Sequence, residues 1–386
     1  MAIEYLKICD FTEVITGGTP STKKSEYWGG TIPWLPSGVC QNCSVFDAKT
    51  FITQEGLDNS AAKMIPINSV LIALTGATAG KVAYLQMEAT ANQSVSAIVP
   101  SEKHIPKYLF YYLLYRRDKT LSDCYGGAQK HISQEYVKNI IVPLPSLEEQ
   151  MRIACELDYA NELIDKRKEQ LRKLDELVKA RFVELFGDPV VNEKGWDTKP
   201  LLEMGSCKNG MNFHYEDTGV EINCLGVGDF KDYSIISDTS ILPTVSLNEM
   251  PSADYMLQDD DIVFVRSNGN KALVGRSIAV YPGDIPTTFS GFCIRYRKTD
   301  KAVSIPYLLR VLKTESVRQK MSGRGANIQN LNQQILGTLI IPVPPMELQN
   351  QFASFVEQTD KSKLEVQKSL EKLELLKKAL MQKYFG

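Results

Sequence analysis

The sequence contains one pattern twice, and this repeat limits the folds that the chain can adopt. Residues 143–154 match residues 342–353 without a gap, and the match includes Gln150 and Gln349. It continues through residues 171–187, which correspond to residues 370–386 at the same spacing of 199. A repeat of this length predicts two related domains, each followed by the same long segment.

Upstream of these segments the two copies have diverged but keep the same order of features. Matching positions are Gly80-Lys81 with Gly275-Arg276, Ser94 with Ser290, and Ile105-Pro106 with Ile305-Pro306. The last pair opens two stretches expected to be helical, 106–121 and 306–321. The glycine-rich loops lie between β-branched runs that are typical of strands. We therefore expect an α+β chain with two α/β domains and two long helices.

Residues 146–187 and 345–386 are the predicted helices, since each runs about 40 residues almost without Pro or Gly and opens after a proline. Apolar residues recur in heptad positions, so each helix needs a partner surface. Antiparallel pairing of the two helices, as a coiled-coil spacer about a pseudo-two-fold axis, fits the connectivity; packing of each helix on its own domain is the alternative. The heptad residues are Ile153, Leu157, Ala160, Ile164, Leu171, Leu174, Val178 and Leu185, then Phe352, Val356, Val366, Leu370, Leu373, Leu380 and Tyr384.

These boundaries predict domains at 1–145 and 188–344, with spacer helices at 146–187 and 345–386. The composition is that of a globular protein, with 43% apolar and 23% charged residues. No apolar run reaches the roughly 18 residues of a membrane span, and the first residues lack the pattern of a signal peptide. We therefore expect a cytoplasmic protein.

Sequence motifs for catalysis and metal binding are absent. Residues 76–81, GATAGK, have three residues between the glycines and Val82 after the lysine, which does not fit a phosphate loop. Residues 343–346 lack the polar and aromatic ends of an amino-methyltransferase motif. Cys40 and Cys43 form the only CxxC pair, without further zinc ligands. We expect no catalytic residue and no metal site.

Charge is unevenly distributed in the second half. Residues 188–265 contain 4 Lys and Arg against 15 Asp and Glu, whereas residues 266–330 contain 12 against 3. The basic segment also carries amides and glycines at 266–271 and 323–330, and such loops suit contacts with phosphates and base edges. A solvated basic face is the alternative interpretation.

The combination resembles the specificity subunits of type I restriction-modification systems over nearly the whole chain. The similar segments are 16–21 (TGGTPS), 27–34 (YWGGTIPW), 71–81 with 92–94, 261–269 (DIVFVRSNG), and 342–345 with Glu347 and Gln349. The resemblance implies two target-recognition domains that each read one half of a bipartite DNA sequence, held apart by the helices. It also implies two modification subunits that methylate adenine and restriction subunits that cleave DNA. S-adenosylmethionine, Mg and ATP are then expected on those partners only, with no cofactor on this chain.

The expected DNA-binding residues come from the glycine-rich and amide-rich loops of both halves. Two other functions stay open on the residues alone: a protein-interaction scaffold that binds no DNA, and an autonomous methyltransferase. The residues expected to contact DNA are Thr78, Lys81, Asn92, Gln129 and Lys130, then Arg266, Asn268, Lys271, Arg276 and Arg324.

Overall fold

The computed structural model describes residues 3–123, 131–213, 218–231, 235–270, 272–322 and 330–386. The chain divides into two compact units. Unit 1 comprises Met1–Glu169 with Gln367–Gly386, and unit 2 comprises Gln170–Val366. Each unit therefore contains one globular part and portions of both long helices, whereas the sequence-based boundaries treat the helices as separate segments.

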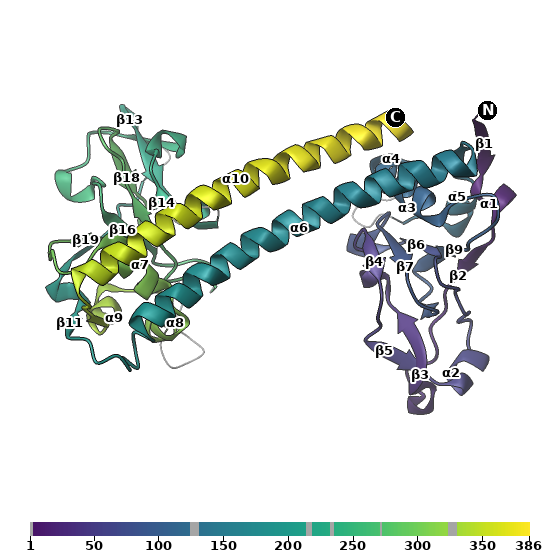
Figure 1. The fold of residues 1–386 in the computed structure, drawn as a ribbon, viewed down its shortest axis with the longest axis horizontal. Coiled ribbons are helices and arrows are strands. Elements are labelled where there is room, and N and C mark those ends of the chain that lie inside the picture. The colour runs from purple at the N-terminus through teal and green to yellow at the C-terminus, as the bar shows by residue number, and fades with distance from the viewer. Residues whose placement is uncertain (1–2, 124–130, 214–217, 232–234, 271, 323–329) are drawn as a thin grey trace. The chain divides into compact units, whose positions relative to one another are not determined.

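The globular part of unit 1 is built on a five-stranded sheet with the order β2-β9-β6-β7-β4 (Figure 1). It also contains a three-stranded sheet, β5-β3-β8, and a two-stranded sheet, β1-β10. The strands are β1 (Glu4–Lys7), β2 (Val14–Thr16), β3 (Trp28–Leu35), β4 (Cys43–Val45), β5 (Thr50–Ile52), β6 (Val70–Ala73), β7 (Val82–Leu85), β8 (Thr90–Ala91), β9 (Val95–Ile98) and β10 (Ile141–Leu144).

Unit 2 repeats this topology strand for strand. Its sheets have the orders β12-β19-β16-β17-β14, β15-β13-β18 and β11-β20. The parallel pairing of the edge strand β4 with β7 recurs as the pairing of β14 with β17. The strands are β11 (Thr198–Pro200), β12 (Gly205–Asn209), β13 (Val220–Leu225), β14 (Ile235–Ile236), β15 (Thr244–Leu247), β16 (Asp261–Val265), β17 (Ser277–Val280), β18 (Thr287–Phe289), β19 (Cys293–Lys298) and β20 (Ile340–Pro342).

The central strands are apolar on both faces because each five-stranded sheet lies between two cores. In β6, Val70 and Ile72 join the core beneath the helices, while Leu71 and Ala73 join the core on the opposite face, with Leu35 of β3. In unit 2, Ile262 and Val263 of β16 divide in the same way. This two-sided burial explains the continuous apolar runs in the sequence.

The helices expected at 106–121 and 306–321 are each broken into two. Unit 1 has α3 (Pro106–Tyr115) and α4 (Arg117–Ser122), and unit 2 has α7 (Ile305–Lys313) and α8 (Glu315–Ser322). In unit 2 the break lies at Thr314, whose backbone is extended and whose hydroxyl donates to the carbonyl of Val311 at 2.7 Å. Such local side-chain bonds compete with a continuous helix.

The remaining helices are short. The α-helices are α1 (Ile8–Phe11), α2 (Gln54–Asp58), α5 (Gln134–Lys138) and α9 (Gln333–Gly337). The 3-10 helices are η1 (Ser25–Tyr27), η2 (Ser37–Val39), η3 (Gly76–Thr78), η4 (Leu201–Glu203), η5 (Val227–Lys231), η6 (Thr239–Ile241) and η7 (Ala253–Tyr255).

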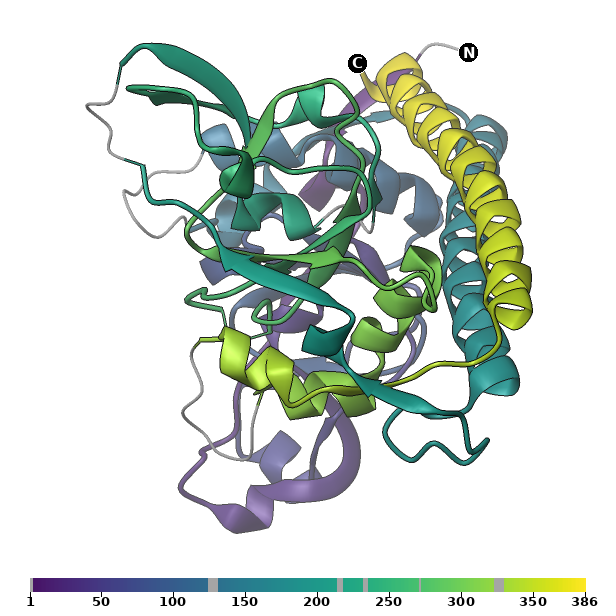
Figure 2. The same cartoon turned by 90° about the vertical axis from the view of Figure 1, so that its left-hand side faces the viewer.

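The two long helices are α6 (Leu147–Phe186) and α10 (Met346–Phe385), each of 40 residues, and they pack antiparallel within both units (Figures 1 and 2). In unit 1, Lys168 of α6 pairs with Glu374 of α10 at 3.5 Å; in unit 2, Asp175 pairs with Lys363 at 2.7 Å. The heptad residues Leu157, Ile164, Val178 and Leu370 are buried. The predicted seam and pairing direction are therefore confirmed.

Repeated glutamines fix the start of each long helix to its own globular part. The Gln150 amide accepts from the backbone N–H of Ile105 and donates to the carbonyl of Pro145, both at 2.9 Å. Gln349 accepts from Ser304 at 2.7 Å and donates to the carbonyls of Ala302 and Pro344 at 2.8 Å. Both side chains are buried, so these bonds explain why the sequence repeats the glutamine.

Repeated aromatics fix the end of each helix to the other globular part. Phe385, at the end of α10, packs edge-on against Tyr108 in unit 1, with ring centroids 5.4 Å apart. Phe186, at the end of α6, packs against Tyr307 in unit 2 at 4.8 Å. The two tyrosines donate to the carbonyls of Pro143 and Pro342, at 2.6 and 2.9 Å.

In the described ranges, no helix combines the length and apolar character that a bilayer crossing requires.

Candidate nucleic-acid interface

Four loops of unit 1 meet at one end of the five-stranded sheet, and we call them loop cluster 1: residues 16–19, 74–81, 92–94 and His131. The backbone N–H of Leu74 donates to Ser94 at 2.8 Å, and Ile132 donates to Leu74 at 2.8 Å. Thr75 and His131 form a β-bridge. The bonds hold the loops in fixed positions relative to the sheet.

Unit 2 builds the same arrangement with other residues, and we call it loop cluster 2: residues 209–212, 266–276, 290–292 and Asn330. Arg266 donates to the carbonyl of Phe292 at 2.7 Å, Leu331 donates to Arg266 at 2.7 Å, and Ser267 bridges Asn330. These bonds are the counterparts of those around Leu74. The backbone of the two loop clusters is therefore conserved by the repeat, while the side chains differ.

A glycine directly after β2, and its counterpart directly after β12, make the close packing of each cluster possible. A methyl group on Gly17 would overlap the backbone carbonyl oxygens of Ala91 and Asn92. A methyl group on Gly210 would overlap the equivalent carbonyls of Phe289 and Ser290. Glycine is needed here because only a residue without a side chain lets the two backbones approach so closely.

The hydrogen bonds correct two correspondences predicted from the sequence. The N–H of Ile105 donates to Gln150 as that of Ser304 donates to Gln349, so pairing Ile105-Pro106 with Ile305-Pro306 was wrong by one residue. Asn92 donates to Leu35 at 2.9 Å, and its structural counterpart is Ser290, which donates to Leu225 at 3.0 Å. Ser94 therefore corresponds to Phe292, and pairing it with Ser290 was wrong by two residues. The strands on both sides of this loop, rather than the shared serine, determine the alignment. The pairing of Gly80 with Gly275 is confirmed, since both N–H groups donate to the end of the preceding strand at 2.9 Å.

The described candidates of unit 1 lie in loop cluster 1, and two of them have local hydrogen bonds. Thr78 ends η3 and is partly exposed. The Lys81 ammonium donates to the side chain of Gln41 at 2.7 Å. The Asn92 side-chain oxygen accepts from the N–H of Ser94 at 3.2 Å, so this oxygen shapes the turn. Gln129 and Lys130 lie outside the described residues.

In unit 2, the described candidates lie in loop cluster 2. One Arg266 nitrogen donates to the carbonyl of Gly291 at 3.2 Å, and Asn268 accepts from the N–H of Asn270 at 2.7 Å. Arg276 is exposed and makes a long contact of 3.4 Å with the carbonyl of Phe230. Lys271 and Arg324 lie outside the described residues. No comparison tests DNA contact by any of these ten residues, which stays a prediction.

Among the described residues of the basic segment 266–330, two arginines are held within the domain rather than on an open surface. Arg297 binds the buried carboxylate of Asp261 through two hydrogen bonds of 2.7 and 2.8 Å, and Arg295 is only 5% exposed. Arg310 and Lys313 lie on α7. The count of basic residues therefore overstates the charge available to DNA or to solvent, because part of that charge has a structural role.

Phe292 is the residue of loop cluster 2 that the sequence did not single out. Its side chain is 60% exposed, although burial of an aromatic ring is strongly favourable. Its backbone carbonyl is occupied by Arg266, so the loop holds the ring at the surface. Phe292 could have been found in the sequence as the counterpart of Ser94, but only with the corrected alignment.

The loop clusters carry polar side chains that can donate and accept hydrogen bonds. In the described ranges, no group of three or more His, Cys, Asp and Glu side chains is arranged to hold a metal ion. Exposed amides, hydroxyls and guanidinium groups lie on rigid backbone, which is the chemistry of sequence recognition.

Comparison with known proteins assigns the chain to a family. The family described as "Type I restriction modification DNA specificity domain" matches residues 2–174 and 193–375. The MjaIX specificity subunit of Methanocaldococcus jannaschii, a type I restriction enzyme subunit, is 26% identical over 98% of this chain and 91% of its own length. The EcoR124I/EcoR124II specificity subunit of Escherichia coli is 30% identical over 45% of each chain.

Solved structures agree with the fold. The S subunit of a type I restriction-modification system from M. genitalium has a TM-score of 0.58 and 16% identity, covering 100% of this chain and 96% of that one. A chain from a study of complex assembly in the type I system has a TM-score of 0.63 and 17% identity, covering 99% and 97%. The scaffold that binds no DNA is therefore not favoured. With one family match in each half of the repeat, the chain belongs to the type I restriction modification DNA specificity domain family.

Proposed function

We propose that the chain is the DNA-binding specificity subunit of a type I restriction-modification complex, and that each loop cluster reads one half of a bipartite target. The observation that carries this proposal is the repeated backbone of the clusters with different side chains on it. Equal backbones present residues to DNA in the same way, while Ser94 and Phe292, for example, offer a hydroxyl and an apolar ring at equivalent positions. Two different half-sequences follow from this difference.

Lys and Arg side chains would contribute salt-dependent binding to phosphates, and the polar and apolar loop residues would select bases. The antiparallel helices would set the number of unread base pairs between the half-sequences. Support comes from the anchors at both ends of each helix, at Gln150 and Phe186 in α6 and at Gln349 and Phe385 in α10.

The chemistry would be supplied by partners in the cytoplasm. Two modification subunits would hold S-adenosylmethionine and methylate adenine, and restriction subunits would use ATP and Mg to translocate and cleave DNA. The chain itself would be non-catalytic and free of cofactor. The repeated anchoring of the helices supports two equivalent partner positions, because each unit presents the same arrangement of secondary structure.

Long-read mapping of methylated adenines tests this function. Cells producing the chain with its modification subunit should methylate one motif, composed of two short specified blocks and a gap of fixed length. Cells lacking the chain should show no such motif. A single continuous motif, or methylation that persists without the chain, would contradict the proposal.

A further inference from the structure

Each unit has a groove at the same place in the repeat, between the helix that covers the five-stranded sheet, the long helices and the edge strand. The groove of unit 1 measures about 850 Å³ and that of unit 2 about 840 Å³. Four positions of α3 line the first groove, and the matching positions of α7 line the second. These are Lys107, Phe110, Tyr111 and Leu114, then Pro306, Leu309, Arg310 and Lys313.

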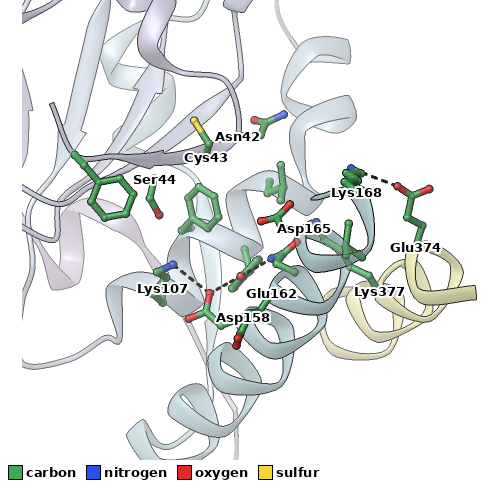
Figure 3. Close-up of a pocket in the computed structure, with 16 residues that line it drawn as sticks. Asn42, Cys43, Ser44, Lys107, Asp158, Glu162, Asp165, Lys168, Glu374 and Lys377 are labelled. Carbon is green, nitrogen blue, oxygen red and sulfur yellow. Dashed lines mark hydrogen bonds and ion pairs between the residues drawn. The ribbon is translucent and has the colours of Figure 1, made fainter. Parts of the chain in front are cut away.

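In unit 1, the polar groups from α3 are satisfied within the groove. The Tyr111 hydroxyl donates to Asp158 of α6 at 2.6 Å and accepts from Asn161 at 2.6 Å. Lys107 pairs with Asp158 at 3.1 Å, and Figure 3 shows this pair beside the carboxylates of Glu162 and Asp165. The lining of this groove carries three lysines, Lys107, Lys168 and Lys377, against four carboxylates, and Asp165 and Glu374 offset the charge of the half-buried Lys377. Positive charge is therefore not in excess here.

In unit 2, the equivalent helix brings in two cations, Arg310 and Lys313, which Asp175 and Asp360 attract without forming an ion pair with them among the described residues. Arg310 replaces Tyr111, and Lys313 follows one turn later on the same face of α7. The Arg310 Nε is buried and has no hydrogen-bond partner among the described residues. The nearby carboxylates of Asp175 and Asp360 both pair with Lys363, at 2.7 and 3.3 Å.

The positive charges of Arg310 and Lys313 also repel each other. Burial lowers the pKa of Lys313 to about 8, and the charge of Arg310 adds to this effect. The groove lining carries five cations against three carboxylates, and a half-buried charge that must share its counter-ion costs folding free energy unless a partner supplies another. The groove therefore complements carboxylates from outside the chain.

The shape of the groove favours a polypeptide segment over a small anion. It follows α10 from Asn350 to Leu364, which is about 21 Å of helix. Val356 and the exposed Leu364 give it an apolar wall along part of that length. A chain segment with both apolar and acidic side chains would cover this wall and reach the cations.

We propose that Arg310 and Lys313 bind carboxylates of an acidic segment of the modification subunit, and that this contact forms in unit 2 only. The inference rests on the proposed function, which supplies the partner. Its consequence is that two identical modification subunits are held with unequal affinity, because the equivalent groove of unit 1 carries Tyr111 and Leu114 in place of the cations.

The test counts modification subunits on the chain by native mass spectrometry over a dilution series. The wild-type chain should carry two copies. The variant Arg310→Gln with Lys313→Gln should lose one copy at a concentration at least tenfold higher than wild type, while the second copy dissociates as before. Lys361→Gln is the matched control, because this lysine lies on the groove wall but is exposed and already pairs with Glu357.

Thermal unfolding of the double variant should occur at or above the wild-type temperature, since the variant removes unpaired charge; a lower temperature would overturn the argument. Dissociation of both copies as in wild type would overturn the inference and leave the proposed function standing. Unchanged copy number with weaker DNA binding would assign the cations to DNA phosphates instead. If the wild-type chain binds no modification subunit at all, the proposed function fails.

Discussion

Lengthening the paired helices should lengthen the unread gap of the DNA target without changing either half-sequence. The perturbation is one heptad inserted after Glu169 in α6 together with one heptad inserted after Val366 in α10. These points lie at the boundary between the two units in both helices. A full heptad keeps the apolar seam in register on both sides of the insertion.

The magnitude follows from helix geometry. Seven residues at 1.5 Å add about 10.5 Å to each helix. At 3.4 Å for each base pair, this corresponds to about three additional base pairs in the gap. The rotation is small, because seven residues make almost two full turns at 3.6 residues per turn.

Long-read methylation mapping measures the gap and both half-sequences in one experiment. The matched control is the heptad in α6 alone, which shifts its seam against α10 and should reduce methylation rather than move the gap. A double insertion that methylates the original motif with the original gap would refute the role of the helices as a spacer. So would a changed half-sequence at constant gap.

Three further substitutions test the anchors and the loops. Gln349→Leu should destabilise unit 2 by about 2–3 kcal/mol in urea unfolding, because it leaves buried backbone groups without partners; a loss below 0.5 kcal/mol would contradict the anchor. Gly17→Ala should impair recognition of one half-sequence and Gly210→Ala that of the other, as seen in motif mapping, since each methyl group would overlap a neighbouring backbone. Burial lowers the pKa of His104 to about 4, so the stability that its neutral form contributes is full above pH 6.5 and is lost as the pH falls to 4. The total loss, roughly 3 kcal/mol, should be absent in His104→Gln when urea unfolding is measured over this pH range.

The repeat allowed the architecture to be predicted because the residues that are identical in both copies make the contacts that constrain the fold most. Gln150 and Gln349 hold backbone groups at the start of the long helices, and Phe186 and Phe385 pack against equivalent tyrosines. These contacts tolerate little change, so they remained visible as identities.

Features that depend on tertiary contacts could not be predicted from the sequence as well. The breaks after α3 and α7 fall in polar sequence without Pro or Gly, at Arg116 and at Thr314. The Thr314 side chain becomes informative only with its bond to Val311. The alignment of Ser94 with Phe292 follows from strand pairing rather than from residue identity. The use of Arg297 to neutralise the buried Asp261 was hidden in the count of basic residues.

The most direct measurement of the central claim, that one chain carries two independent readers, is the methylated motif of two reciprocal variants. Ser94→Phe in loop cluster 1 should alter only the first half-sequence, and Phe292→Ser in loop cluster 2 should alter only the second, with the gap unchanged in both. If either substitution alters both half-sequences, or if both leave the motif intact, the claim of separate readers is contradicted.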